Sequence, residues 1–135
     1  MTRTKTVSRE RYTVFWNRAK QYHDSMGESF ARGAYDACIS HAVHCAISSL
    51  DSVSVRLIGK KSSAQNHNEI VLLLKEEKTS QESEKSRVID ATLRLIDMKS
   101  VAEYEDRAMS KADAEKAVVL CNKVHSFAEK EIENG

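Results

Sequence analysis

The sequence has 135 residues, with 21 lysines and arginines against 20 aspartates and glutamates, and a formal net charge of +1. This length suits one domain with its own hydrophobic core. The chain has no proline and only 4 glycines, a composition that favours helices over a strand-and-turn architecture. The near-neutral charge argues against a general nucleic-acid coat protein and against a polybasic membrane binder.

The three cysteines, Cys38, Cys45 and Cys121, are too few and odd in number to form a disulfide framework. Sparse cysteine use is typical of a reducing compartment, so we expect a cytoplasmic protein. Residues 1–10 are polar, and no apolar run approaches the ~20 residues that span a bilayer. We therefore expect neither a secretion signal nor a membrane partner.

Residues 1–8 form a polar, basic lead-in that is interpreted either as a solvated tail or as an arm that contacts phosphates. One domain is expected over residues 9–133. The first helix is predicted over residues 9–26, where apolar residues recur at spacings of three and four, and Gly27 is expected to end it. The second helix is predicted over residues 29–58, before Gly59. Its small and apolar side chains indicate a central helix that is crowded on several sides.

The later elements are predicted from polarity and capping. Residues 60–66 are expected to form a polar loop. The apolar run at residues 70–74 is consistent with a buried strand, but we favour a helix over residues 67–76, because the chain offers no second strand to pair with it. Residues 76–86 are polar and are predicted to be a flexible surface loop or a frayed helix start.

A fourth helix is predicted over residues 84–99, followed by an irregular segment over residues 100–109. Ser110 and Asp113 match a helix N-cap with an acidic third position, which predicts a last helix that runs to about residue 133. Five helices with short links predict an all-α fold, namely an antiparallel helical bundle.

Two patterns suggest ligand chemistry. Cys38, His41 and Cys45 lie on one helical stripe and are residue types that zinc favours. Ligands from a single helix rarely surround a tetrahedral ion, so we interpret them as core residues and predict neither a metal nor a cofactor. Lys60 and Lys61 stand with two serines before a predicted helix, which is compatible with a loose anion site or an ordinary solvated loop.

Two stretches resemble a known family. Residues 35–47, YDACISHAVHCAI, resemble the second helix of HEPN domains (higher eukaryotes and prokaryotes nucleotide-binding). Residues 104–107, YEDR, with the helix that follows them, resemble the Tyr-x-x-Arg segment and the final helix of that family. The resemblance covers residues 9–133. It implies an antiparallel helical bundle, usually a homodimer with a cleft between its protomers.

The resemblance also bears on activity. Many HEPN domains are toxins that cut RNA without a metal, and others accompany small nucleotidyltransferases or bind nucleotides. The ribonuclease members carry an arginine and, after four to six residues, a histidine near the start of a late helix. In this sequence only Arg18 and His23 have that spacing, and they fall in the first predicted helix. Five residues turn a helix by about 140°, so the two side chains are expected to diverge.

The missing late Arg–His pair favours binding over catalysis and leaves enzymatic activity undecided. We predict a homodimeric HEPN-like module that binds a nucleotide, RNA or a nucleotidyltransferase-type partner, including an antitoxin. The alternatives are a metal-independent endoribonuclease toxin with a non-standard active site and a structural interaction protein. Tyr104 and Arg107 are the first candidates for a ligand or dimer cleft, because an aromatic ring and a guanidinium together can hold a base and a phosphate. The further candidates are His67, His44, Lys60 and Lys61.

Overall fold

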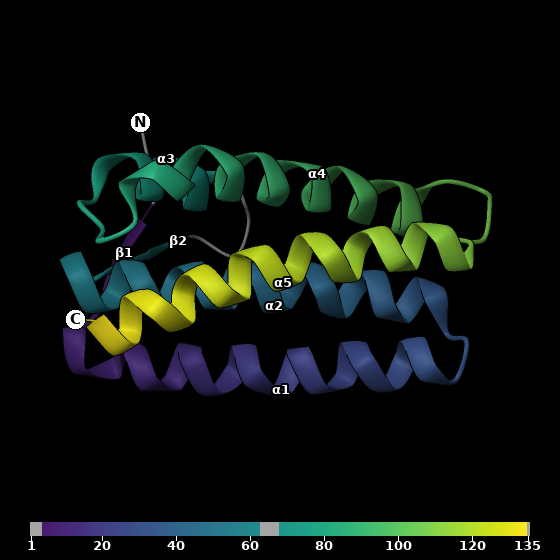
Figure 1. The fold of residues 1–135 in the computed structure, drawn as a ribbon, viewed down its shortest axis with the longest axis horizontal. Helices are drawn as coiled ribbons and strands as arrows, with labels where there is room; N and C mark the ends of the chain where they lie inside the picture. Colours follow the sequence, from purple (N-terminus) through teal and green to yellow (C-terminus); the bar gives the residue numbers. More distant parts are fainter. Residues whose placement is uncertain (1–3, 63–67, 135) are drawn as a thin grey trace.

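The computed structural model describes residues 4–62 and 68–134, and Figure 1 shows its helices lying side by side in alternating directions. The described residues form five α-helices: α1 (Tyr12–Ala31), α2 (Tyr35–Ile58), α3 (Glu69–Glu76), α4 (Lys85–Tyr104) and α5 (Lys111–Asn134). The smaller elements are the strands β1 (Thr4–Thr6) and β2 (Lys60–Ser62) and the 3-10 turns η1 (Arg9–Arg11) and η2 (Glu82–Glu84). The predicted all-α bundle is confirmed, and a small sheet is added to it.

Helix α2 lies at the centre of the bundle, in contact with α1, α4 and α5. Its side chains between Cys38 and Val55 are mostly buried, and many of them are alanine, serine or cysteine. Small side chains let neighbouring helices approach closely, so the predicted crowded central helix is confirmed. The helix ends as expected at Gly59, whose φ of 65° lies in the left-handed region that glycine tolerates.

Helix α1 is longer than predicted, because it continues through Gly27 to Ala31. Met26 and Ser29 are buried in the core, and the Phe30 ring contacts the ring of Tyr35 at the start of α2. This packing outweighs the cost of about 1 kcal/mol that a glycine imposes inside a helix. The turn into α2 instead uses Gly33, with a φ of 76°. Residues 29–34, predicted to begin the second helix, therefore lie before it.

Residues 4–6 are not a tail, and residues 60–62 are not a loop, because they pair as the antiparallel strands β1 and β2. The pairing is anchored by Asp51 of α2, whose Oδ1 accepts hydrogen bonds from the backbone N–H and the hydroxyl of Ser62, both at 2.9 Å. Val7 adds a backbone hydrogen bond to the carbonyl of Gly59. The sequence showed no strand here because both partners are short and polar. The rest of the predicted loop, residues 63–66, lies outside the described residues.

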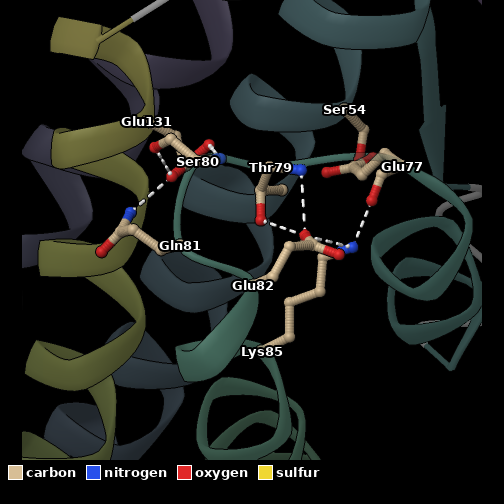
Figure 2. A network of polar contacts seen from close by, with 8 residues as sticks. All are labelled: Ser54, Glu77, Thr79, Ser80, Gln81, Glu82, Lys85 and Glu131. Atoms are coloured by element: carbon tan, nitrogen blue, oxygen red, sulfur yellow. Dashed lines mark hydrogen bonds and ion pairs between the residues drawn. The ribbon is translucent and has the colours of Figure 1, made fainter.

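The polar link between α3 and α4 is held by hydrogen bonds, contrary to the predicted flexible loop. Figure 2 shows Ser80 and Gln81 directed at the buried carboxylate of Glu131 on α5, at distances of 2.5–2.8 Å. On the other side of the link, Lys85 forms an ion pair with Glu82 at 2.8 Å. The contacts with Glu131 connect residues 50 and 51 positions apart, which a local reading of polarity does not reveal.

The helical interpretation of residues 70–74 is confirmed by α3, and its first predicted residue, His67, lies outside the described residues. Helix α4 extends to Tyr104, so part of the predicted irregular segment is helical. The cap of α5 is confirmed: the Ser110 hydroxyl accepts from the Asp113 N–H at 3.1 Å, and the Asp113 carboxylate accepts from the Ser110 N–H at 3.0 Å.

Two acidic side chains are buried near the β1–β2 sheet. Burial raises the pKa of Asp51 to about 6, although its hydrogen bonds with Ser62 act in the opposite direction. Burial also raises the pKa of Glu77 to about 7, against a hydrogen bond from the Ser54 hydroxyl to its Oε2 at 2.8 Å. The other oxygen of Glu77 has no hydrogen-bond partner among the described residues. The folded protein therefore holds these protons more tightly than the unfolded chain.

We predict that the protein becomes less stable as the pH rises from 5 to 8, because both carboxyls lose their protons while buried. Stability from this source is complete below about pH 4 and is lost through pH 7, and Glu77 accounts for on the order of 3 kcal/mol. Glu77→Gln should flatten the dependence of the melting temperature on pH. The matched control Glu76→Gln changes an exposed neighbour and should leave it intact. Identical pH profiles for wild type and Glu77→Gln would contradict this account.

Candidate functional site

The structure places the first two candidates at the end of the bundle where α4 leads into α5 (Figure 1). Tyr104 is the last residue of α4 and is 82% exposed. Arg107 lies in the link, and its Nη1 is 3.6 Å from the carboxylate of Asp113. Arg107 also borders a small hollow of about 160 Å³ against Met98 and Met109. This end therefore presents an aromatic ring and a guanidinium, and the hollow beside the guanidinium is smaller than the roughly 300–1,000 Å³ of a typical ligand pocket.

The other candidates do not join them. Lys60 and Lys61 belong to β2, at the opposite end of the bundle (Figure 1). His44 lies within α2, half-buried, with its ring 5.2 Å from the ring of Tyr22 on α1. His67 lies outside the described residues. The candidates chosen from the sequence thus fall in separate parts of the fold.

The three residues of the predicted cysteine and histidine stripe on α2, Cys38, His41 and Cys45, contact different parts of the fold. Cys38 and Cys45 are fully buried, whereas His41 is half-buried beside the Tyr22 ring. Among the residues that the structure describes, no three histidine, cysteine or acidic side chains converge in a way that would hold a metal ion. Cys45 does not face His41 but faces α5, where the structure gathers other polar groups.

Three rings form a column between α1 and α5. The ring of His125 on α5 lies between Trp16 and His23 of α1, with both centroid separations at 4.6 Å. The interplanar angles are 16° and 14°, so the rings are stacked. Trp16 and His23 meet the same partner because seven residues make about two helical turns. All three rings are half-buried, which leaves part of the column open to solvent.

Polar side chains set the orientation of both imidazoles. His23 Nε2 donates a hydrogen bond to Asn122 Oδ1 at 2.8 Å. His125 Nδ1 is hydrogen-bonded to the Ser49 hydroxyl at 2.9 Å and lies 3.7 Å from the sulfur of Cys45. The contacts join residues 76 to 99 positions apart. We call the set Trp16, His23, Ser49, Asn122 and His125 the histidine stack.

The two buried thiols next to the histidine stack, Cys45 and Cys121, have pKa values shifted in opposite directions. A hydrogen bond from Cys121 and the neighbouring His125 imidazole lower the pKa of the Cys45 thiol, against the effect of burial. The pKa of Cys121 is raised by the same hydrogen bond and by burial. Both thiols are fully buried, so neither can reach a substrate in this conformation. The half-buried imidazoles are the groups of this cluster that can meet a ligand.

A groove of about 640 Å³ runs between α4 and α5, next to the histidine stack. Its apolar lining residues are Val88, Val119 and Phe127, and its polar and charged lining residues are Gln81, Glu84, Arg87, Asn122, Lys123, Ser126 and Lys130. Three cations, one carboxylate, two side-chain amides and a hydroxyl therefore line the groove together with three apolar side chains. Its volume lies within the range of about 300–1,000 Å³ that is typical of ligand sites.

The groove is held by the contacts that order the link before α4. Gln81 donates to the backbone carbonyl of Phe127 at 2.9 Å and to Glu131, which fixes one wall (Figure 2). Arg87 lies 3.2 Å from the exposed carboxylate of Glu84, so its charge is partly neutralised. Asn122 belongs both to the groove and to the histidine stack, so the two form one continuous surface over α5.

The comparison with known families agrees with this architecture. The family model of the HEPN domain matches residues 12–132. The chain belongs to the HEPN domain family. No curated protein matches the chain in sequence. Within the part of this HEPN domain that the structure describes, no helix has the length and apolar character that a membrane crossing requires.

The pair with ribonuclease-like spacing does not form one site in this HEPN domain. The Arg18 guanidinium lies over the ring of Phe15, 5.3 Å from its centroid, whereas His23 contacts Asn122 and His125. The expected divergence is confirmed by these separate partners.

Sequence reasoning missed the α5 side of the site. His125 was not singled out because its partners lie on other helices. A signal was present in the polar positions 122, 126 and 130 of the last helix, whose spacing of four places them on one face.

Proposed function

We propose that this HEPN domain is a binding module for a nucleotide, either free or within RNA, and that the groove between α4 and α5 is its site. The observation that carries the proposal is that Lys123, Lys130 and Arg87 line one groove together with the apolar side chains of Val88, Val119 and Phe127. Cations suit the phosphates, and the apolar side chains suit the flat face of a base. The amide of Asn122 and the hydroxyl of Ser126 supply hydrogen bonds to polar edges.

The proposal includes a cellular setting taken from the family. We infer that the protein is a cytoplasmic homodimer. We also infer that one of its binding partners is a nucleotidyltransferase-type antitoxin. A purely structural role is less favoured, because a groove with three cations and few acidic groups is not needed to hold a scaffold together. Lys60 and Lys61 contribute to anion binding elsewhere on the surface, and His44 and His67 stay as further candidates for ligand contacts.

Removing two groove cations should weaken nucleotide binding. We expect Lys123→Gln with Lys130→Gln to lower affinity for a fluorescent nucleoside triphosphate by at least about a hundredfold, because each hydrogen bond to a charged group contributes roughly 1.5–3 kcal/mol and about 1.4 kcal/mol is tenfold in affinity. Fluorescence anisotropy measures the affinity. The matched control, Lys111→Gln with Lys116→Gln, makes the same charge change on the same helix outside the groove. Equal losses in both double variants would show that only net charge matters.

A second candidate function, metal-independent RNA cleavage, is favoured by the two imidazoles of the histidine stack. Such cleavage needs a base for the 2′-hydroxyl and an acid for the leaving oxygen, and histidine serves both roles near neutral pH. The 4.6 Å separation of the His23 and His125 rings brings two such groups into one site. The arrangement would differ from the Arg–His pair of the ribonuclease members.

Incubation of labelled total RNA with the purified protein in EDTA separates the two functions. Our first proposal predicts binding without cleavage. Cleavage that persists in EDTA and disappears in His23→Gln or His125→Phe would establish the ribonuclease instead. Arg107→Ala tests the opposite end of the bundle, and Arg18→Ala serves as the control for the non-convergent pair. Circular dichroism confirms that each variant is folded.

We propose that the two protomers of the dimer contact each other at the end of the bundle that carries Tyr104 and Arg107. An aromatic ring that is 82% exposed and a neighbouring arginine are residue types enriched at protein interfaces. We predict a dimer of the 15.2 kDa chain in light scattering at micromolar concentration. Tyr104→Ser should shift it toward monomer, whereas Val14→Ser, at an exposed apolar position of α1, should not. A monomeric wild type would contradict the proposal.

A further inference from the structure

A second cationic surface lies at the end of the bundle that carries the sheet (Figure 1). It is built from β1, η1, the last turn of α2, and β2, and we call it the basic end. Its cations are Lys5, Arg9, Arg11, Arg56, Lys60 and Lys61. The same segments hold one acidic residue, Glu10. In a protein with a net charge of +1, this is a marked separation of charge.

The fold brings these cations together with little neutralisation. Burial raises the pKa of the Asp51 carboxyl while the charge of Lys61 acts to lower it, and the Nζ of Lys61 donates to the Ser62 carbonyl at 3.0 Å. Lys5 lies directly opposite Lys61 in the β1–β2 ladder, and like charges at facing positions destabilise a strand pair. Among the described residues, none of the six cations forms an ion pair. The nearby carboxylate of Asp51 is buried and accepts hydrogen bonds from Ser62. A polyanionic ligand would relieve the repulsion that the fold leaves in place.

Two arginines of the basic end are already ordered. The Arg56 guanidinium lies over the ring of Tyr12, 4.7 Å from its centroid. Arg9 donates from Nε to the backbone carbonyl of Arg56 at 2.6 Å. Both line a groove of about 440 Å³, which Glu10 and Leu57 also border. A planar guanidinium binds a phosphate through two parallel hydrogen bonds, and fixing it in advance lowers the entropy lost on binding.

We propose that the basic end binds the phosphate backbone of a single-stranded nucleic acid without reading its bases. The cations are spread over two strands and two helical segments, which suits several successive phosphates better than one. The Tyr12 ring, the aromatic group of this groove, is covered by Arg56, so that face offers no platform for a base. Ile58, at 36% exposure, is the nearby exposed apolar side chain, which is little for insertion into a lipid surface.

The proposed function concerns one nucleotide, whereas the basic end would bind the strand that contains it. The proposal for the basic end rests on the proposed function only in taking a nucleic acid as the ligand. The basic-end groove and the α4–α5 groove share no lining residue. Each surface can therefore be disabled while the other is left unchanged.

The test uses the full chain and fluorescein-labelled 12-nucleotide strands of RNA and DNA with the same sequence. Lys5→Gln, Arg11→Gln and Lys60→Gln together should weaken binding of both strands at least tenfold at 50 mM salt. Losing three phosphate contacts should also lower the slope of log affinity against log salt by about 2. The matched triple variant Arg32→Gln, Lys111→Gln and Lys116→Gln changes exposed cations nearer the other end and should retain wild-type binding.

The remaining outcomes decide the ligand and its contacts. Arg56→Lys keeps the charge but loses the bidentate geometry, and it should bind several-fold more weakly than wild type. Equal losses in the two triple variants, or unchanged binding in the basic-end variant, would overturn the proposal. So would wild-type binding of inorganic tripolyphosphate as tight as that of the strands, or preferential binding to anionic phospholipid vesicles. Mononucleotide binding in the α4–α5 groove should be unchanged in the basic-end variant, so failure of one proposal is distinguishable from failure of the other.

Discussion

The structure depends on the close packing around α2. Its buried positions hold alanine, serine and cysteine between larger aliphatic residues, and this lets α1 and α5 lie against it on neighbouring sides. Because both helices sit close to α2, Trp16 and His23 of α1 stack on His125 of α5, and the Ser49 hydroxyl of α2 hydrogen-bonds the same imidazole. A larger side chain in place of Ser49 would force the helices apart, since well-packed interiors tolerate little added volume.

The second consequence of this packing is that polar groups enter the interior, where most of them are hydrogen-bonded. Asp51 holds Ser62, and Glu131 holds Ser80 and Gln81. Unpaired buried polar groups cost free energy, so these bonds fix segments that would otherwise be ordinary loops. One of the segments becomes β2 at the basic end, and the other becomes the wall of the α4–α5 groove. The sites on the surface are thus shaped by polar contacts in the core.

Net charge is a poor guide to where positive charge gathers on the surface of this protein. The near-neutral total argues against a protein coated in positive charge, yet it does not describe how the charges are distributed. The fold places Lys5 opposite Lys61 and sets Lys123 and Lys130 along one groove. Four of the acidic side chains, Asp51, Glu69, Glu77 and Glu131, are buried, and Asp113 is used in a helix cap. Electrostatic attraction depends on the local field within about a Debye length, roughly 8–10 Å, and not on the sum over the chain.

The sequence by itself determined the helical bundle, the central position of α2, the glycine stop at Gly59 and the capping box of Ser110 and Asp113. Each of these follows from residues within a few positions of one another, through periodicity, small side chains or a local hydrogen bond. It also indicated the HEPN family. The end of α1, the β1–β2 pairing, the histidine stack and the α4–α5 groove were decided only by the tertiary structure. Their contacts join His23 to Asn122, Ser49 to His125 and Gln81 to Glu131 across 99, 76 and 50 positions, and no local pattern encodes which distant side chain a helix face will meet.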